Sequence, residues 1–411
     1  MAGATIDHIV SIIIFLAALV LFINLFSQTV QTAIIYEQHR ATATKCSDLI
    51  DNILLNPGSP SSWGQTDGVP TEFGLQDPEF TQYQLSAFSA MRVSSPSGDQ
   101  VYYKQPNQTY SGTVASLTNN LFIPTSQTVD YHTVLQLLGI NNTYGFQLNI
   151  EPLVTVSVNE TQAANPLKLE LTVSGTGFPL ANATINYCLI QVGLPATGAD
   201  YPSYTMQNGE KQADEAGMVQ VQIPSITTSS QCYAFVAYAY LGGLLGVGYH
   251  ERVSSTTEYV VPLIQDIQSQ QVLLANSFDL NNSGPAGESL KYNATFALLT
   301  DDYQLRELPL NESNNLSEVG TVTSGVGNPD VTLTLPPNVG ILIVTYSDGP
   351  SSGGIALMPW GVSSLGYPIS FGGSSQTQMW VTSDVRQVTI NDVSYQATLD
   401  LWSSTGQQVN S

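Results

Sequence analysis

The first part of the chain contains a long, uninterrupted apolar run. Between residues 9 and 26 only Ser11 and Asn24 are polar, and no charged residue occurs. A helix of about 20 such residues has the length needed to cross the hydrocarbon core of a bilayer. The run therefore predicts one membrane-spanning helix. A cleaved secretory signal is the alternative, but the basic start, short apolar region and small-residue cleavage site of such signals are not clear here.

The apolar pattern continues beyond residue 26 at helical spacing. Charged residues such as Glu37, Arg40 and Asp51 lie between the apolar positions, so the second half of the predicted helix is amphipathic. The helix is expected to end at Asn56-Pro57-Gly58, because proline disfavours helix in the residue before it and glycine accepts left-handed geometry. A rod of about 50 residues, on the order of 75 Å long, would result. Its apolar stripe consists of Val30, Ala33, Ile34, Cys46, Leu49, Ile50, Ile53 and Leu54.

Several features of about the first 80 residues occur together. They are the apolar run, Asp7 just ahead of it, and Leu55-Asn56-Pro57-Gly58-Ser59-Pro60 followed by Trp63 and Phe73-Gly74-Leu75. In this combination the chain resembles the archaeal type IV pilin-like proteins. The resemblance implies a hydrophobic helix, an amphipathic half and a β-rich head, with self-association into a filament through the helix.

The resemblance also implies roles for residues of the first helix. If cleavage fell after Ala2, Asp7 would be the fifth mature residue, where pilins carry an acid that pairs with a neighbouring subunit's N-terminus. Apolar side chains of the helix would pack against neighbouring helices in the filament; they are Phe15, Leu19, Phe22 and Phe26. The leader lacks the usual basic residue, so an uncleaved single-pass anchor, with membrane lipid as the partner of the helix, is the alternative.

After the helix the pattern changes to short strand-like runs. Residues 57–150 contain such runs at 101–103 and 146–150, separated by Gly, Pro and Asn clusters, and they predict a β-rich head domain. Asp130 can cap a short helix that carries apolar residues at 134–138, and Gly139 can end it.

Residues 151–256 show the spacing of an immunoglobulin-like (Ig-like) sandwich. Alternating or apolar runs occupy residues 153–158, 167–173, 183–190, 218–224 and 232–240. The segments Gly177-Phe178-Pro179-Leu180-Ala181-Asn182-Ala183-Thr184 and Asp214-Glu215-Ala216-Gly217-Met218 resemble the B–C turn and the turn before strand E of bacterial and archaeal Ig-like surface repeats.

An internal repeat predicts a second sandwich. Val219-Gln220-Val221-Gln222-Ile223-Pro224 recurs as Val331-Thr332-Leu333-Thr334-Leu335-Pro336, and Val331 follows Val219 by 112 residues, the size of one such domain. Residues 257–411 are therefore assigned to a second, divergent β-sandwich. The whole chain is mainly β: helix (1–56), head and two tandem Ig-like sandwiches that are expected to give length and rigidity.

The three cysteines allow one disulfide. In the sandwich reading Cys188 falls late in strand C and Cys232 early in strand F, and these antiparallel neighbours bring the two ends together. A Cys188–Cys232 bridge is therefore expected, with Cys46 left as the odd thiol on the rod.

Composition and charge locate the protein and limit its partners. Charged residues make up only 10% of the chain, and 32 acidic against 10 basic residues give a net charge of −22, which disfavours nucleic-acid binding. A literal positive-inside count from Arg40 and Lys45 would place the bulk in the cytoplasm, but low charge, β-rich composition and glycosylation sequons favour the outside. The sequons begin at Asn107, Asn141, Asn159, Asn182, Asn281, Asn293, Asn311 and Asn315.

Candidate chemistry is sparse. The four histidines are scattered, and no hydrolase, metalloprotease or phosphate-binding motif occurs in the sequence. Residues 279–284 begin like a calcium loop, but Leu290 stands where the bidentate Glu is needed. The aromatic run Tyr233, Phe235, Tyr238 and Tyr240 is more typical of a strand ladder with core and surface positions than of a sugar platform. We expect no enzyme, no metal and no cofactor.

These patterns predict an extracellular structural protein of the cell surface, anchored by its N-terminal helix. The leading interpretation is a pilin-like filament subunit that packs through this helix. The alternatives are a single-pass, membrane-anchored Ig-like adhesin or stalk, and an envelope polysaccharide-binding protein or enzyme with a cleft that sequence cannot reveal. Other cell-surface proteins or glycans stay open as partners.

Overall fold

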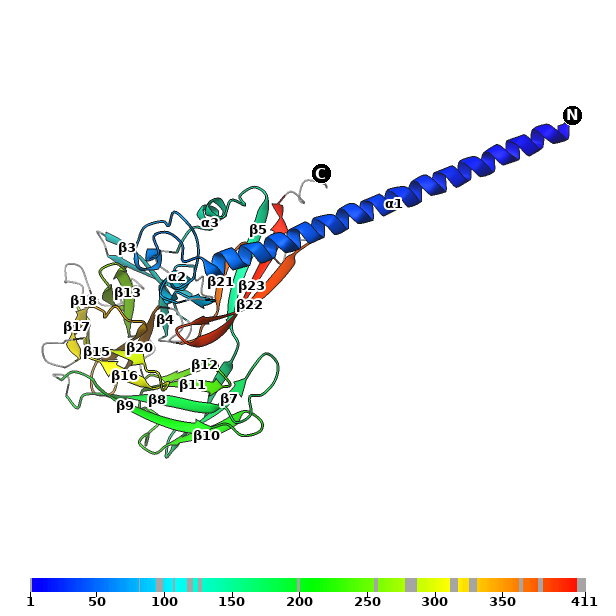
Figure 1. Ribbon diagram of the computed structural model, residues 1–411. Helices are drawn as coiled ribbons and strands as arrows, with labels where there is room; N and C mark the ends of the chain where they lie inside the picture. The colour runs from blue at the N-terminus through cyan, green and yellow to red at the C-terminus, as the bar shows by residue number, and fades with distance from the viewer. Residues whose placement is uncertain are drawn as a thin grey trace.

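The computed structural model describes residues 2–80, 82–93, 99–105, 108–116, 121–124, 128–197, 200–254, 258–277, 287–310, 317–324, 331–361, 365–375 and 380–404. One long helix projects from a folded body made of β-sheets (Figure 1). The body consists of a head next to the helix and two sandwiches. The predicted class, mainly β with a long N-terminal helix, is confirmed.

Helix α1 runs from Ala2 to Leu55. It ends where the sequence predicts, because Pro57 follows and Gly58 adopts a positive φ of 77°. The Asn56 side chain accepts a hydrogen bond from the Gly58 backbone N–H (2.9 Å), and the Leu75 N–H donates to the carbonyl of Ile53 (2.8 Å). The exposed carbonyls at the helix end are thus partly satisfied by the chain that returns along it.

The head is built on a five-stranded sheet in the order β1-β22-β23-β5-β21. Two short helices and a 3-10 turn accompany it, and Asp130 caps α3 as predicted by accepting a bond from the Thr133 N–H (3.0 Å). The sheet comprises β1 (Gln84–Leu85), β5 (Tyr144–Pro152), β21 (Ile369–Gly372), β22 (Thr382–Ile390) and β23 (Val393–Ser403). The remaining elements are η1 (Trp63–Gln65), α2 (Ala87–Met91), α3 (Tyr131–Leu137) and a small sheet of β2 (Asp99–Gln105), β3 (Gln108–Ser116) and β4 (Phe122–Pro124).

The C-terminal strands correct one predicted boundary. Strand β23 pairs with the whole length of β5, from Tyr395 opposite Pro152 to Ser403 opposite Tyr144. Strand β22 continues the same sheet. The assignment of all of residues 257–411 to a second sandwich is therefore wrong for these strands, and the head is built from two distant parts of the chain.

The first sandwich contains seven strands in the order β10-β7-β6-β12-β11-β8-β9. The sheet folds over a closed apolar core in which β7 and β10 face β8 and β11. The five predicted runs correspond to β6, β7, β8, β10 and β11, while β9 and β12 were not predicted. The strands are β6 (Thr155–Gln162), β7 (Leu167–Ser174), β8 (Thr184–Gly193), β9 (Ser203–Gln212), β10 (Met218–Ile223), β11 (Tyr233–Leu241) and β12 (Leu244–Arg252).

The second sandwich repeats this plan, as the sequence repeat predicts. Strands β14 and β18 pair as β7 and β10 do, and β15, β19 and β20 pair as β8, β11 and β12 do. Its strands are β13 (Val260–Asp266), β14 (Gln271–Asn276), β15 (Ser289–Leu299), β16 (Leu305–Leu308), β17 (Glu318–Thr323), β18 (Val331–Thr334), β19 (Gly340–Ser347) and β20 (Gly353–Trp360).

The two sandwiches pack side by side. The outer faces of β8, β11 and β12 belong to the same buried apolar cluster as the second sandwich and the head. Side-chain amides of Asn186 and Asn208 donate to the carbonyls of Asp302 and Leu305 (both 3.1 Å) across the boundary. The expectation that the sandwiches add length is therefore wrong, because their broad faces are in contact and neither extends beyond the other as a stalk (Figure 1).

Candidate functional site

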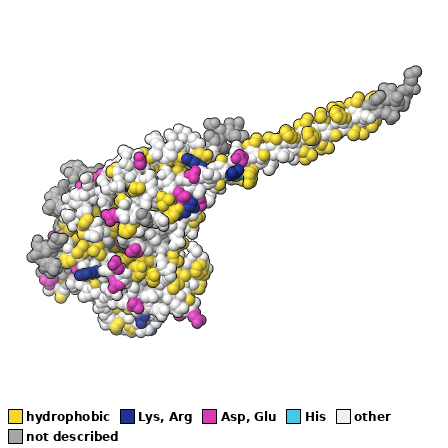
Figure 2. Space-filling view, viewed as in Figure 1, with side chains coloured by type: hydrophobic (Ala, Val, Ile, Leu, Met, Phe, Trp, Pro, Cys, Tyr) yellow, Lys and Arg dark blue, Asp and Glu magenta, His cyan; other side chains and the backbone are white. Residues whose placement is uncertain are grey.

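The projecting part of α1 is the most unusual surface of the molecule. Every described side chain from residue 9 to residue 36 is exposed, and the stretch includes an 18-residue window with a mean hydropathy of 3.0, none of it buried. By length and composition this helix could cross a membrane. Figure 2 shows the apolar surface along the helix, whereas the surface of the folded body mixes apolar, charged and other side chains.

The predicted assembly residues lie on this projecting surface. The exposed fractions of Phe15, Leu19, Phe22 and Phe26 range from 43% to 67%, and the rings of Phe22 and Phe26 stack at 6.4 Å. The Asp7 side chain lies outside the part of the chain that the structure describes. The exposed Phe and Leu side chains require lipid or other apolar surfaces, because exposed apolar area is unfavourable in water by about 25 cal/mol per Å².

Two polar side chains within this helix are satisfied locally. The hydroxyl of Thr29 donates to the carbonyl of Leu25, and that of Thr32 donates to the carbonyl of Gln28, both at 2.8 Å. Bonds of this kind lower the free energy needed to place a hydroxyl in an apolar environment. The helix is therefore compatible with low polarity well beyond residue 26.

The last three turns of α1 lie against the head sheet. Cys46, Leu49, Ile50, Ile53 and Leu54 are all buried, and α1 contacts β22 and β23. These are the apolar positions that the sequence predicts for the amphipathic half. The same helix is thus fully exposed over its first part and integrated into the head core over its last part (Figure 1).

A charged cluster fixes the helix against β22. The Arg386 guanidinium binds both carboxylate oxygens of Asp51 (Nε–Oδ1 2.8 Å, Nη2–Oδ2 3.2 Å) and also Asp384 (Nη1–Oδ1 2.8 Å). The Tyr83 hydroxyl donates to Asp51 (3.0 Å). The Asp51 carboxylate raises the pKa of Arg386, so this guanidinium stays charged. Sequence analysis missed this cluster, because no local pattern links residues more than 300 positions apart.

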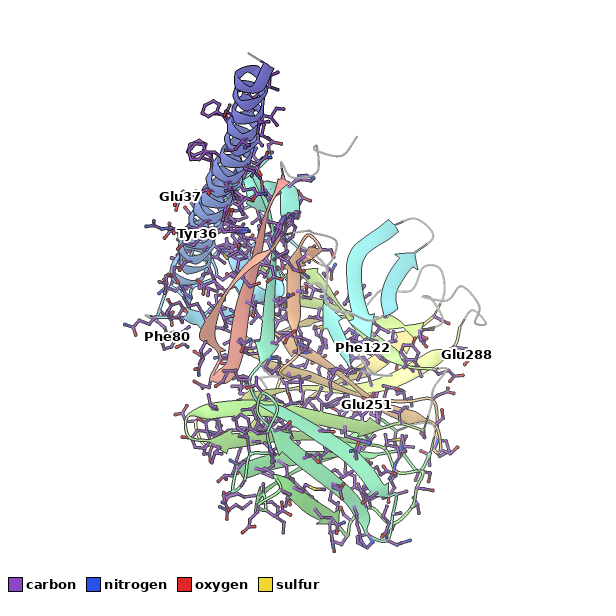
Figure 3. The ribbon with its side chains drawn as sticks, turned by 90° about the vertical axis from the view of Figure 1, so that its right-hand side faces the viewer. Tyr36, Glu37, Phe80, Phe122, Glu251 and Glu288 are labelled. Carbon is purple, nitrogen blue, oxygen red and sulfur yellow. The ribbon has the colours of Figure 1, made fainter. Side chains whose placement is uncertain are left out.

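Aromatic side chains surround the point where the helix leaves the head. The rings of His39 and Trp380 meet edge to face at 5.2 Å, and Trp380 stays largely exposed. Tyr36 extends from the helix one turn earlier (Figure 3). Trp and Tyr side chains are typical of surfaces that lie between an apolar and an aqueous region.

The predicted disulfide is wrong. Cys188 lies opposite Val236 in the β8–β11 pair, whereas the Cys232 carbonyl accepts from Val192 N–H, four residues farther along β8. Four residues of strand place the Cα atoms of the two cysteines about 14 Å apart along the strands. A disulfide needs Cα atoms within about 7 Å. All three cysteines are free and buried. The Cys232 thiol instead donates to the Gly353 carbonyl (3.4 Å) of the second sandwich.

We therefore expect three reactive thiols after denaturation without reductant, and almost none in the native protein. Burial protects the thiols and raises the pKa of Cys46 to about 11 and that of Cys188 to about 12, so few thiolates form. Titration with a thiol reagent with and without denaturant measures both numbers. A single thiol in the denatured, unreduced protein would indicate a bridge and contradict the strand register.

The sequons differ in accessibility. Asn141, Asn159 and Asn182 are exposed. Asn293 is half-buried on β15 and its amide donates to the Pro202 carbonyl (3.1 Å), so the geometry opposes a glycan there. The predicted sequons at Asn107, Asn281, Asn311 and Asn315 lie outside the described residues.

The aromatic run that could have formed a sugar platform has mainly a structural role. Tyr233 and Phe235 are buried in the first core, Tyr238 is buried between the sandwiches, and the exposed Tyr240 stacks on Tyr303 at 5.3 Å, so the core interpretation holds for the first three. Among the described residues, no group of three or more His, Cys, Asp or Glu could hold a metal. The calcium-like segment 279–284 lies outside them.

One partly buried ionic cluster closes the end of the first sandwich. Arg252 binds Glu160 (3.1 Å), lies 4.9 Å from the Tyr233 ring centre, and donates to the Gln231 carbonyl (3.0 Å). Burial lowers the pKa of His250, which stacks on Tyr233, so its imidazole is neutral at pH 7. The cluster joins three strands, and Nε and Nη1 of Arg252 supply its hydrogen bonds.

Comparisons with known proteins leave the family open. No protein-family model matches the sequence. No curated protein matches it either. Among solved structures, the D0–D1 domain of intimin aligns at 10% identity over 54% of this chain and 98% of its own, with a TM-score of 0.20.

Two further structures align as loosely. Invasin, described as a bacterial integrin-binding protein, aligns at 15% identity over 60% of this chain and 54% of its own (TM-score 0.15). The α2-macroglobulin of Escherichia coli aligns at 9% identity over 57% of this chain, which spans only 18% of that protein (TM-score 0.21). Scores this low carry no argument about function. What the structure itself gives is a mainly β protein with an N-terminal helix long and apolar enough to cross a membrane.

Proposed function

We propose that this chain is a structural protein of the cell surface that assembles into a filament through α1. The division of this helix supports the proposal most directly. Residues 9–36 are exposed and apolar, while residues 46–54 belong to the head core. A subunit of this form places its head at a fixed position relative to whatever covers the projecting helix.

Two environments can cover the projecting helix. Membrane lipid covers a single apolar helix, and neighbouring copies of the same helix cover it in a filament core. We propose both in sequence: lipid before assembly, and neighbouring helices afterwards. In this pilin-like arrangement Phe15, Leu19, Phe22 and Phe26 pack between copies, and Asp7 pairs with a neighbour's N-terminus.

The arrangement of the two sandwiches favours a filament subunit over a stalk. A stalk gains reach when its domains are joined end to end, but here the two sandwiches share a buried face. Accessible sequons at Asn141, Asn159 and Asn182, together with the low charge density, favour an extracellular head. The proposal assigns no catalytic activity and no nucleic-acid partner to the chain.

A membrane-anchored adhesin-like protein is the second candidate. The exposed Trp380 and Tyr36 at the base of the helix support it, because such side chains are enriched where a helix leaves a bilayer. In that arrangement α1 stays in lipid, and the sandwiches present a binding face without any contact between copies.

Replacing two phenylalanines of the helix distinguishes the candidates. The double variant Phe15→Ala/Phe22→Ala keeps the helix apolar enough to insert, but removes large rings that pack between helices. We expect it to abolish filaments and to leave the chain in the membrane fraction. Electron microscopy of sheared appendages, with mass spectrometry of their subunit, measures the first result, and membrane fractionation measures the second.

A variant in the first sandwich is the matched control. Phe178→Ala changes an exposed phenylalanine in the loop between β7 and β8, and it should leave both filaments and membrane insertion unchanged. If appendages never contain this chain, or if the double variant assembles normally, the filament proposal is wrong and the anchored arrangement replaces it. Asp7→Ala should also prevent assembly, but should scarcely affect an anchored protein.

A further inference from the structure

A cleft of about 620 Å³ lies in the body below the end of α1, within the size range of small-ligand sites. Three segments far apart in the sequence line it. They are the head segment that contributes residues 61–65, 77–80 and 84–88, the turn at 337–339 between β18 and β19, and the turn at 391–392 between β22 and β23. We call it the Phe80 cleft, after the exposed ring on its lining, which lies near the base of the helix (Figure 3).

Buried contacts hold the head side of the cleft in place. The Arg92 guanidinium is buried, and its Nη1 donates to the carbonyls of Trp63 (2.6 Å), Thr66 (2.7 Å) and Gly68 (2.9 Å). The Trp63 indole donates to the Gly74 carbonyl (3.0 Å). These bonds fix the loop that carries Gln65, so binding there needs little reordering of the backbone.

The other walls are also fixed by backbone bonds. The Asp77 N–H donates to the Gln84 carbonyl (2.9 Å), which closes the loop that carries Phe80. Asn391 and Asp392 both have positive φ (44° and 69°) and form a tight two-residue turn between the paired strand ends. The cleft is therefore largely preformed.

The lining is polar and contains no cation. The side-chain amides of Gln65, Gln84, Asn338 and Asn391 make no hydrogen bond within the described part of the chain, so they can bind a ligand. Three serines, Ser61, Ser62 and Ser86, and three carboxylates, from Asp77, Glu79 and Asp392, complete the polar lining. No Lys, Arg or His among the described residues lines the cleft. Phe80, half exposed, offers a flat apolar face beside these groups.

We propose that the Phe80 cleft binds a neutral, polyhydroxylated ligand, a hexose-based oligosaccharide. Amides donate to and accept from hydroxyl groups, carboxylates accept from them, and the face of an aromatic ring packs on the apolar C–H side of a sugar ring. Anionic glycans are disfavoured, because the lining carries carboxylates without cations and the whole chain has a net charge of −22. This binding does not depend on filament assembly.

A glycan array tests the proposal with the full chain in micelles of a sugar-free polyoxyethylene detergent. The probes are neutral hexose oligosaccharides, matched uronic-acid oligosaccharides and a basic oligolysine peptide. We expect retention on neutral oligosaccharides, competed by the same sugar in solution. Phe80→Ser and Gln65→Ala should each weaken the binding by about fivefold or more. Both positions are exposed, so the fold should be retained, as circular dichroism can verify.

Phe178→Ser, at an exposed phenylalanine of the first sandwich, is the matched control and should bind as the unchanged chain does. Retention on no neutral glycan overturns the proposal. So does retention that Phe80→Ser leaves unchanged, because the sugar would then bind elsewhere. Retention on oligolysine alone would also overturn it and would identify a site for cationic partners. None of these outcomes alters the expected effect of the helix variants on filaments.

Discussion

A shortened chain that begins at Glu37 is expected to be soluble and monomeric without detergent, whereas the full chain requires detergent or assembly. The deletion removes only residues whose described side chains are all exposed, and the deleted stretch contains the whole apolar window. The shortened chain retains the contact between His39 and Trp380 and every buried residue of the helix. Size-exclusion chromatography with light scattering measures the mass in solution.

The same shortened chain should unfold at nearly the temperature of the full chain in detergent, because no buried contact is lost. Circular dichroism of both chains tests this. A shortened chain that precipitates, or that melts more than about 10 °C lower, would mean that the projecting helix contributes to the stability of the head. The division of α1 into an exposed part and a core part would then be wrong.

Ile50→Ala is expected to lower the free energy of unfolding by about 2 to 5 kcal/mol. Ile50 is fully buried where α1 meets the head sheet, so the shorter side chain leaves a cavity between the helix and the sheet. Equilibrium unfolding of the shortened chain in urea measures the change.

Leu55→Ala is the control for this substitution. Leu55 is the last residue of the same helix and is 41% exposed, so its truncation should change the unfolding free energy by less than about 1 kcal/mol. Equal effects of the two variants would contradict the burial of the helix against the sheet.

Local patterns in the sequence predicted a large part of this architecture. The apolar run, the amphipathic stripe and the Pro57-Gly58 stop determine α1, because each depends on residues close together in the chain. The repeat that includes Val219 and Val331 identified two sandwiches, since their equivalent strands have similar alternation. Turn glycines such as Gly217, with a φ of 72°, marked the strand ends.

Sheet partners over long distances could not be predicted in this way. The alternation in β22 and β23 shows that these are strands, but it does not specify β5 as the neighbour of β23. The error at Cys188 and Cys232 has a related cause, because strand periodicity gives the face of a residue and not the offset between two strands. The Phe80 cleft likewise depends on turns that meet only after the chain has folded.

The candidate assembly surface was predictable, but the charged cluster between α1 and β22 was not. Phe15 and Phe22 belong to a continuous apolar segment, so their place on one apolar helix follows from the sequence alone. Arg386 and Asp51 look like two ordinary charged residues until β22 is placed beside α1. Only the fold brings the two side chains together and joins the helix to β22.

The position of β22 and β23 against α1 imposes an order of events during synthesis. The Cys46 thiol donates to the carbonyl of Leu399, 353 residues later in the chain. At ribosomal rates of about 5 to 20 residues per second, the surface that covers the last turns of the helix emerges about 20 to 70 s after the helix itself. The apolar first half is therefore available for membrane insertion long before the head can close. The buried face of the last helical turns stays uncovered until the final strands have been synthesised.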